Sequence, residues 1–210
     1  MKNNDDILEQ VGCLFNKFGI KSVTMDDISR EMGISKKTLY QFVSDKDDLV
    51  AKAVAHDFNR AIAARDQTIG NSKDAIEQLI RLQLWINIKI KHYSHAIEYD
   101  LKKYYPAVFA ELKSRKRESM FNMFYGNILR GKKEEIYRNN IKEEIIAKLF
   151  VYTIDSIADN QVISIEEFVS NQFHKEIIEY HIRGIANKKG ISLLENYLLN
   201  EEFNPEMNNN

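Results

Sequence analysis

The chain has 210 residues and a formal net charge of -1, so any surface that binds nucleic acid must be local. Its one cysteine, Cys13, excludes an internal disulfide and a multi-cysteine metal site. The sequence has no basic-then-apolar signal region and no apolar run of about 18 residues, so we expect a cytoplasmic protein without a membrane segment.

Few breakers interrupt the chain, since it has two prolines and eight glycines, and long helices are favoured over a β-rich fold. The first predicted helix ends at Gly19, because apolar residues recur every three or four positions from Ile7 to Phe18. Within this helix, Cys13 is expected to be a small buried residue.

Two short helices are predicted next, with Thr24 and Ser35 as N-caps and a sharp turn of positive φ at Gly33 between them. Asp45 is then expected to cap a longer helix that begins at Lys46. Residues 1–45 are therefore expected to form a compact domain of three helices.

The later helices are expected to form a second domain over 46–204, entered through a linking helix at 46–67. The stretch LQLWINIKI alternates apolar and polar residues as a strand would, but its apolar residues also fit a helix with a broad buried face. No partner strand is evident, so we predict a helix and an all-α fold. Further helices are expected over 95–103, 106–129, 141–159, 165–186 and 191–199, with Gly190 separating the last two and a frayed tail at 205–210.

The short helix after Gly33 is unusual in its charge. From Gly33 to Ser44 the chain has two lysines, Lys36 and Lys37, and no acidic residue. DNA is a dense line of negative charge, so an acidic side chain on a helix that faces it would be repelled. Two short helices joined through a glycine turn are typical of the helix-turn-helix, whose second helix enters the major groove. The same pattern also occurs in plain helical bundles.

The segment VTMDDISREMGISKKTLYQFVSDKDDLV, residues 23–50, resembles the DNA-binding signature of the tetracycline-repressor-like (TetR) family of bacterial regulators. The resemblance rests on the threonine, isoleucine and Gly-Ile-Ser of its first half, then on Thr-Leu-Tyr, Phe-Val and the final lysine and leucine. It implies an all-α dimer with an N-terminal helix-turn-helix domain and a C-terminal domain for ligand binding and dimerisation. The implied function is a DNA-binding transcriptional regulator, most often a ligand-responsive repressor bound to a palindromic operator.

The resemblance also implies which residues meet DNA. Lys36 and Lys37 occupy the start of the recognition helix, where lysine bonds guanine or a phosphate. Tyr40 and Lys46 match positions that contact the DNA backbone; the alternatives are core packing for Tyr40 and a solvated charge for Lys46. Asp26 departs from the basic or polar residue of some members. The whole expected set is Thr24, Ser35, Lys36, Lys37, Thr38, Tyr40, Gln41, Phe42 and Lys46, in which Thr24 meets a phosphate and Phe42 either contacts DNA or packs.

For the second domain, the resemblance implies a four-helix bundle in which helices 141–159 and 165–186 pair with their symmetry mates. The residues expected at this interface are Phe150, Phe168, Phe173, Ile177, Tyr180 and Gly184, with burial inside the monomer as the alternative.

The middle helices are expected to hold a hydrophobic or aromatic small molecule in a mostly apolar pocket. Its expected lining is Trp85, His92, Tyr99, Phe121, Phe124 and Tyr152, with core packing as the alternative for each. The helix that begins at Lys46 is expected to be the only direct covalent link between this pocket and the recognition unit.

The sequence has no nucleophile motif, glycine-rich phosphate loop or metal cluster, so we expect no enzymatic activity and no cofactor. His92 and His95 stand three residues apart, but without a cysteine or a clear acidic third ligand a metal site is not expected. The alternative function is a helical small-molecule-binding or interaction protein with vestigial DNA binding. Lys36, Tyr40 and Lys46 argue against it.

Overall fold

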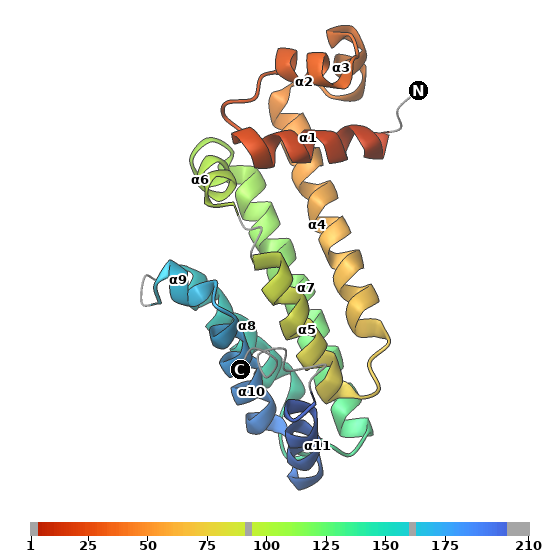
Figure 1. The fold of residues 1–210 in the computed structure, drawn as a ribbon, viewed down its shortest axis with the longest axis vertical. Helices are drawn as coiled ribbons and strands as arrows, with labels where there is room; N and C mark the ends of the chain where they lie inside the picture. Colours follow the sequence, from red (N-terminus) through yellow and green to blue (C-terminus); the bar gives the residue numbers. More distant parts are fainter. Residues whose placement is uncertain (1–3, 91–93, 160–162, 201–210) are drawn as a thin grey trace. The chain divides into compact units, whose positions relative to one another are not determined.

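The computed structural model describes residues 4–90, 94–159 and 163–200, and within these ranges the protein is all-α, as the sequence predicts (Figure 1). Its helices are α1 (Asn4–Phe18), α2 (Met25–Met32), α3 (Lys36–Phe42), α4 (Lys46–Gly70), α5 (Ala75–Ile90), α6 (His95–Tyr104), α7 (Pro106–Lys133), α8 (Glu143–Asp159), α9 (Ile165–Phe168), α10 (Asn171–Ile185) and α11 (Lys188–Leu198). An isolated antiparallel bridge joins Tyr137 and Ala186. Among the described residues, no helix combines the length and apolar character that crossing a membrane requires.

Packing divides the chain into two compact units. The first consists of Met1–Ala63 and Tyr93–Lys116, and the second of Ala64–His92 and Arg117–Asn210. Helices α4 and α7 contribute residues to both units, and the chain passes between the units again after α5. The recognition helix is joined to the later segments through α4, so the role of this helix as the direct covalent link between a pocket and the recognition unit stays a prediction. The predicted boundary between a DNA-binding domain at 1–45 and a second domain at 46–204 stays a prediction. The two units are defined by which residues contact one another, and not by which residues bind DNA.

The first unit has one apolar core. Val11 of α1, Ile28 of α2 and Leu39 of α3 are buried in it together. Figure 1 shows α2 and α3 side by side. Leu101 of α6 and Tyr105, which precedes α7, join the same core. Helices from the middle of the chain thus complete the unit that the N-terminal segment begins.

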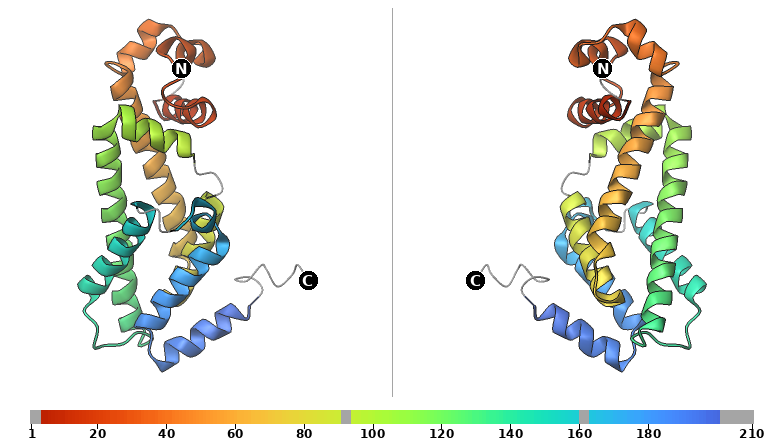
Figure 2. Two further views of the ribbon diagram at one scale, coloured as in Figure 1. Left: turned by 90° about the vertical axis from the view of Figure 1, so that its left-hand side faces the viewer. Right: turned by 90° about the vertical axis from the view of Figure 1, so that its right-hand side faces the viewer.

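The second unit contains α5, whose sequence is ambiguous between a strand and a helix. Ile76, Leu79, Ile80 and Leu82 are buried, whereas Ile88 is exposed, which is the distribution of a helix with a broad buried face. The helix packs against α10 and α11 (Figure 2). The helix prediction is therefore confirmed.

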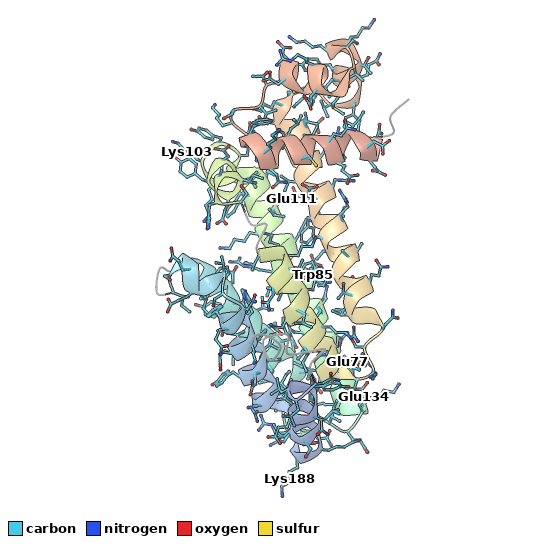
Figure 3. The ribbon with its side chains drawn as sticks, viewed as in Figure 1. Glu77, Trp85, Lys103, Glu111, Glu134 and Lys188 are labelled. Atoms are coloured by element: carbon cyan, nitrogen blue, oxygen red, sulfur yellow. The ribbon has the colours of Figure 1, made fainter. Side chains whose placement is uncertain are left out.

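Hydrogen bonds between buried groups close one end of the second unit. Asn127 Nδ2 donates to Ala75 O and to Gln78 Oε1, both at 2.7 Å. Tyr137 Oη donates to Asn127 Oδ1 at 3.0 Å. Glu134, labelled in Figure 3, accepts from Ala75 N through its Oε2 at 2.8 Å. Buried polar groups without partners would cost about 1–3 kcal/mol each, so this network stabilises the start of α5.

Two predicted helix boundaries are wrong. The segment 165–186 is divided into α9 and α10, because Ser170 Oγ accepts from Phe173 N at 3.2 Å and so caps a new helix. Gly190 lies inside α11 and does not precede it. There Asn187 is the N-cap, and its Oδ1 accepts from Gly190 N at 3.1 Å.

The prediction of a buried Cys13 is also wrong, since this side chain is exposed. Cys13 lies two positions from both Val11 and Phe15, which are buried. Two positions on a helix correspond to about half a turn, so the thiol faces away from the core side of α1.

Candidate nucleic-acid interface

Helix α2 begins with a reciprocal capping box. Thr24 Oγ1 accepts from Asp27 N at 3.2 Å, and Asp27 Oδ2 accepts from Thr24 N at 3.1 Å. The Thr24 hydroxyl also donates to Asp27 Oδ2 at 2.6 Å. These hydrogen bonds from Thr24 lower the pKa of Asp27, so the carboxylate stays charged at the positive end of the helix. The cap prediction is confirmed, and the phosphate contact of Thr24 stays a prediction.

A left-handed residue then turns the chain from α2 to α3. Gly33 has φ 65° and ψ 30°, and its amide donates to Arg30 O at 3.2 Å. This conformation costs little only without a Cβ, as the sequence predicts. Ser35 Oγ accepts from Thr38 N at 3.0 Å and thereby caps α3.

Helix α3 buries one side chain and exposes a polar face. Leu39 is buried, whereas the exposed residues are Lys36, Lys37, Thr38, Tyr40 and Gln41. Tyr40 is 49% exposed, so half of its surface remains available to a partner. Helix α3 thus brings these five members of the predicted set together, whereas Thr24, Ser35 and Lys46 lie outside it.

An acidic residue of α2 is paired with the first lysine of α3. Lys36 Nζ forms an ion pair with Asp26, and both side chains are more than half exposed. The carboxylate partly neutralises a cation that is expected to meet DNA. Asp26 is therefore the residue of this surface least suited to binding DNA. The sequence alone does not reveal its ion pair with Lys36.

A lysine that the sequence reasoning missed holds the end of α3. Lys52 Nζ donates to Phe42 O and to Asp48 Oδ2, both at 2.9 Å. The same ammonium lies 5.1 Å from the centre of the Phe42 ring, which packs against the core of the first unit. The packing alternative for Phe42 is thus the one the geometry favours. The spacing of Asp48 and Lys52, four apart on one helix, is the signal that could have pointed to this pair.

Lys46 has an unexpected set of partners. Its Nζ donates to Ile20 O at 2.8 Å and to Lys21 O at 3.4 Å, in the turn between α1 and α2. Asp45 caps α4 as predicted, because its Oδ1 accepts from Asp48 N at 2.8 Å. The alternative in which Lys46 is only a solvated charge does not fit these two hydrogen bonds. Its expected phosphate contact stays a prediction.

Comparison with known proteins decides what kind of helix-turn-helix this is. Residues 13–53 match the model of the bacterial regulatory proteins of the tetR family. This segment is therefore a DNA-binding domain of the tetR family. The protein is a DNA-binding transcriptional regulator.

Similarity extends beyond the recognition unit. The chain is 22% identical over 167 residues to the uncharacterized HTH-type transcriptional regulator YvaF of Bacillus subtilis, which covers 79% of this chain and 86% of the relative. A transcriptional regulator from Cytophaga hutchinsonii has a similar crystal structure, with a TM-score of 0.72 at 16% identity over 86% of this chain and 97% of that one. The TetR family regulator CifR, solved with double-stranded operator DNA, has a TM-score of 0.56 at 15% identity over 87% and 99% of the two chains. These structures share the fold.

The residues predicted to line a ligand pocket are dispersed. Trp85, Phe121 and Phe124 join the core of the second unit. Tyr99 is exposed in the first unit, where its Oη accepts from Lys103 Nζ, and Tyr152 is 72% exposed. His92 lies outside the described residues.

An aromatic cluster in the second unit surrounds a histidine that the sequence reasoning missed. The ring centroid of His181 lies 4.1 Å from that of Phe150 and 5.4 Å from that of Phe124. Its Nε2 is buried without a hydrogen-bond partner, as are Trp85 Nε1 and Asn87 Oδ1. Burial among apolar groups lowers the pKa of His181 to about 4, so the imidazole is neutral at pH 7. Its position three residues after Ile178 and four before Ile185, on the apolar face of α10, is the sequence signal that could have found it.

The predicted dimer residues also fall into two groups. The half-buried ring of Phe150 contacts Phe124 and packs against the core of the second unit, which favours burial inside the monomer for this residue. Phe168, Phe173 and Ile177 are half-buried. Tyr180 is 83% exposed and Gly184 is exposed one turn further along α10.

Among the described residues, no group of three or more His, Cys, Asp and Glu side chains could hold a metal ion.

We predict that Asp26→Asn strengthens DNA binding. The change preserves side-chain shape but removes a negative charge and releases Lys36 from its ion pair. Exposed pairs contribute little, so affinity for any DNA should rise about two- to fivefold. The salt dependence should become steeper by about 0.9 in log–log slope per subunit, because one more cation is available to phosphates.

Titration of a DNA duplex by fluorescence anisotropy at several salt concentrations measures both quantities. Glu31→Gln, at another exposed acid of α2, is the matched control and should change the slope less. Unchanged or weaker binding by Asp26→Asn would show that the Lys36 cation does not face DNA.

We predict that the protein loses stability on acidification because of His181. The unfolded histidine binds a proton near pH 6.5, but the folded one does so only near pH 4. Stability from the neutral ring is thus present above pH 6.5 and is lost as the pH falls towards 4. About 2 kcal/mol of unfolding free energy should disappear between pH 7 and pH 5. Urea unfolding of wild type and His181→Phe at both pH values measures this, and an equal pH dependence in the two proteins would contradict it.

Proposed function

We propose that this TetR-family regulator is a homodimeric repressor that binds a palindromic operator and is released from it by a small hydrophobic or aromatic effector. The observation that carries the proposal is the exposed face of α3, which presents lysine, threonine, tyrosine and glutamine side chains without an acidic one. Such a face suits the edges of bases and their phosphates, since it combines donors with positive charge.

An exposed apolar surface supports dimerisation. Ile145, Leu149 and Tyr152 lie at positions i, i+4 and i+7 of α8, and all three are more than half exposed. Tyr180 and Gly184 lie one turn apart on α10. Exposed apolar stripes of this kind on two helices are costly in water and typical of helix–helix interfaces. A dimer would also present two recognition helices to half-sites about 34–36 Å apart.

The aromatic cluster of the second unit supports an effector. Binding pockets are mostly apolar with a few polar groups that orient the ligand. Phe124 and Phe150 supply the apolar part, and the unpartnered Nε2 of His181, whose ring contacts both phenylalanines, supplies a polar atom. A neutral imidazole favours an uncharged effector over an organic acid or amine.

An effector releases DNA only if it binds the DNA-free conformation better. By reciprocity, DNA then weakens effector binding by the same factor, typically about 5–150-fold for a coupling of about 1–3 kcal/mol. A compound that stabilises the protein in a thermal-shift screen without changing its operator affinity would contradict this part of the proposal.

We predict that the protein prefers a palindrome near its own promoter to scrambled DNA of the same composition. Lys36→Ala should reduce this preference by about 1–3 kcal/mol, because lysine at the start of α3 can bond a guanine edge. Anisotropy titrations with both duplexes measure the preference, with Lys188→Ala on α11 as a control of equal charge change.

Equal losses on both duplexes for Lys36→Ala would make it a phosphate contact. Wild-type protein without any preference for sequence would favour the alternative, a ligand-binding or interaction protein with vestigial DNA binding.

We predict that Leu149→Glu converts the dimer to a monomer, because it places a charge in the apolar stripe of α8. Light scattering after gel filtration should give twice the 24.6 kDa chain mass for wild type and 24.6 kDa for the variant. Ser192→Glu adds the same charge at an exposed position of α11 and should remain dimeric. A dimeric Leu149→Glu protein would place the interface elsewhere.

A further inference from the structure

The first turn of α2 carries two adjacent acidic residues that have different partners. Asp27 belongs to the capping box with Thr24, and its Oδ1 is paired with Arg30 of the same helix. Asp26 takes no part in this box, and its Oδ1 is paired with Lys36 of α3. A carboxylate in the first turn is ordinarily explained by the positive end of its own helix. Asp27 fills that role here, so the helix dipole does not account for the contact of Asp26 with another helix.

Charge in the helix-turn-helix segment is balanced, so the position of each cation matters. Residues 20–45 have no net charge, because they contain four basic and four acidic side chains. These are Lys21, Arg30, Lys36, Lys37, Asp26, Asp27, Glu31 and Asp45. Binding to DNA of arbitrary sequence is essentially the attraction of cations for phosphates. Lys36 is paired with a carboxylate, whereas Lys37 forms no ion pair with a residue that the structure describes, so the two lysines of α3 are not equivalent.

The ion pair leaves the Lys36 ammonium able to read a base. An ammonium has three N–H groups, and one oxygen of Asp26 engages one of them. The remaining two match N7 and O6 of guanine, the acceptors that lysine bonds in the major groove. Both side chains are more than half exposed, so a base edge can approach while the pair stays formed. Without the carboxylate, the flexible lysine stem would let the ammonium exchange between base edges and nearby phosphates.

We propose that Asp26 is a positioning residue that sets base specificity, because it holds the Lys36 ammonium for the edge of a guanine and withholds it from phosphates. DNA of arbitrary sequence then meets one available cation fewer, whereas an operator guanine is still bonded by the remaining N–H groups. The ratio of specific to non-specific affinity is therefore larger than Lys36 alone would give. The inference rests on the proposed function, because it concerns how the recognition helix distinguishes an operator from other DNA.

Replacement of each base pair of one operator half-site in turn tests this role by anisotropy titration. In wild type, replacing the G·C pair that Lys36 reads should weaken binding about 5–150-fold. Lys36→Ala identifies this pair, because that loss should disappear in the variant. In Asp26→Asn the loss at the same pair should shrink about threefold, with losses at other pairs unchanged. Asp26→Glu keeps the charge and should restore most of the wild-type loss. Identical profiles for wild type and Asp26→Asn, or for wild type and Lys36→Ala, would overturn the proposal.

Scrambled DNA tests the withholding of the cation without depending on an operator. Asp26→Asn should steepen the log–log slope against salt by about 0.9 per subunit, because Lys36 becomes available to phosphates. In a Lys36→Met background the same change should leave the slope as it is. Lys37→Met is the matched control and should reduce the slope by about 0.9 per subunit with either residue at position 26.

An equal effect of Asp26→Asn with and without the Lys36 ammonium would overturn the proposal, since the carboxylate would then act on DNA directly. Failure of the proposed function would appear separately, as a wild type that prefers no operator. The slopes on scrambled DNA would then still support or overturn the withholding of Lys36 by Asp26.

Discussion

The recognition helix is too short to exist on its own, and the rest of the first unit follows from that constraint. Helix α3 has 7 residues, whereas isolated helices shorter than about 12–15 residues are marginal in water. Its helical form and position must therefore come from its surroundings. Leu39 supplies the buried contact, Ser35 caps the start, and Lys52 binds the carbonyl of Phe42 at the end. Side chains on the opposite face are left to meet DNA.

Some lysines near the recognition helix support its structure, and others are exposed on its surface. The lysines of α4, Lys46 and Lys52, are used on backbone carbonyls inside the protein, whereas those of α3 are exposed. Lys46 binds the turn before α2, and Lys52 binds the last residue of α3. A count of basic residues near the motif would treat all of them as DNA contacts. The partner atoms show which of these lysines already bind backbone carbonyls inside the protein, and the sequence does not.

The sequence predicts the local features and misses those that depend on distant segments. Thr24, Gly33, Ser35 and Asp45 were predictable because a cap or a left-handed turn requires particular residue types within a few positions. The pairing of Asp100 with Lys21 joins residues 79 positions apart, and no pattern announces it. The split of 165–186 was missed because apolar spacing continues across Ser170. Phe150 packs against the core whereas Tyr152 is exposed, because residues two positions apart on a helix point in directions that differ by about 200°, and their apolar character alone does not show which of them faces inwards.

The structure of the protein bound to its operator tests the central claim most directly, which is that internal bonds to the α1–α2 turn position a recognition helix that carries the DNA contacts. Lys36 and Lys37 should then lie in the major groove, while Lys46 Nζ stays within about 3.2 Å of Ile20 O. An operator complex in which Lys36 and Lys37 lie outside the major groove, or in which Lys46 Nζ has left Ile20 O, would contradict the account.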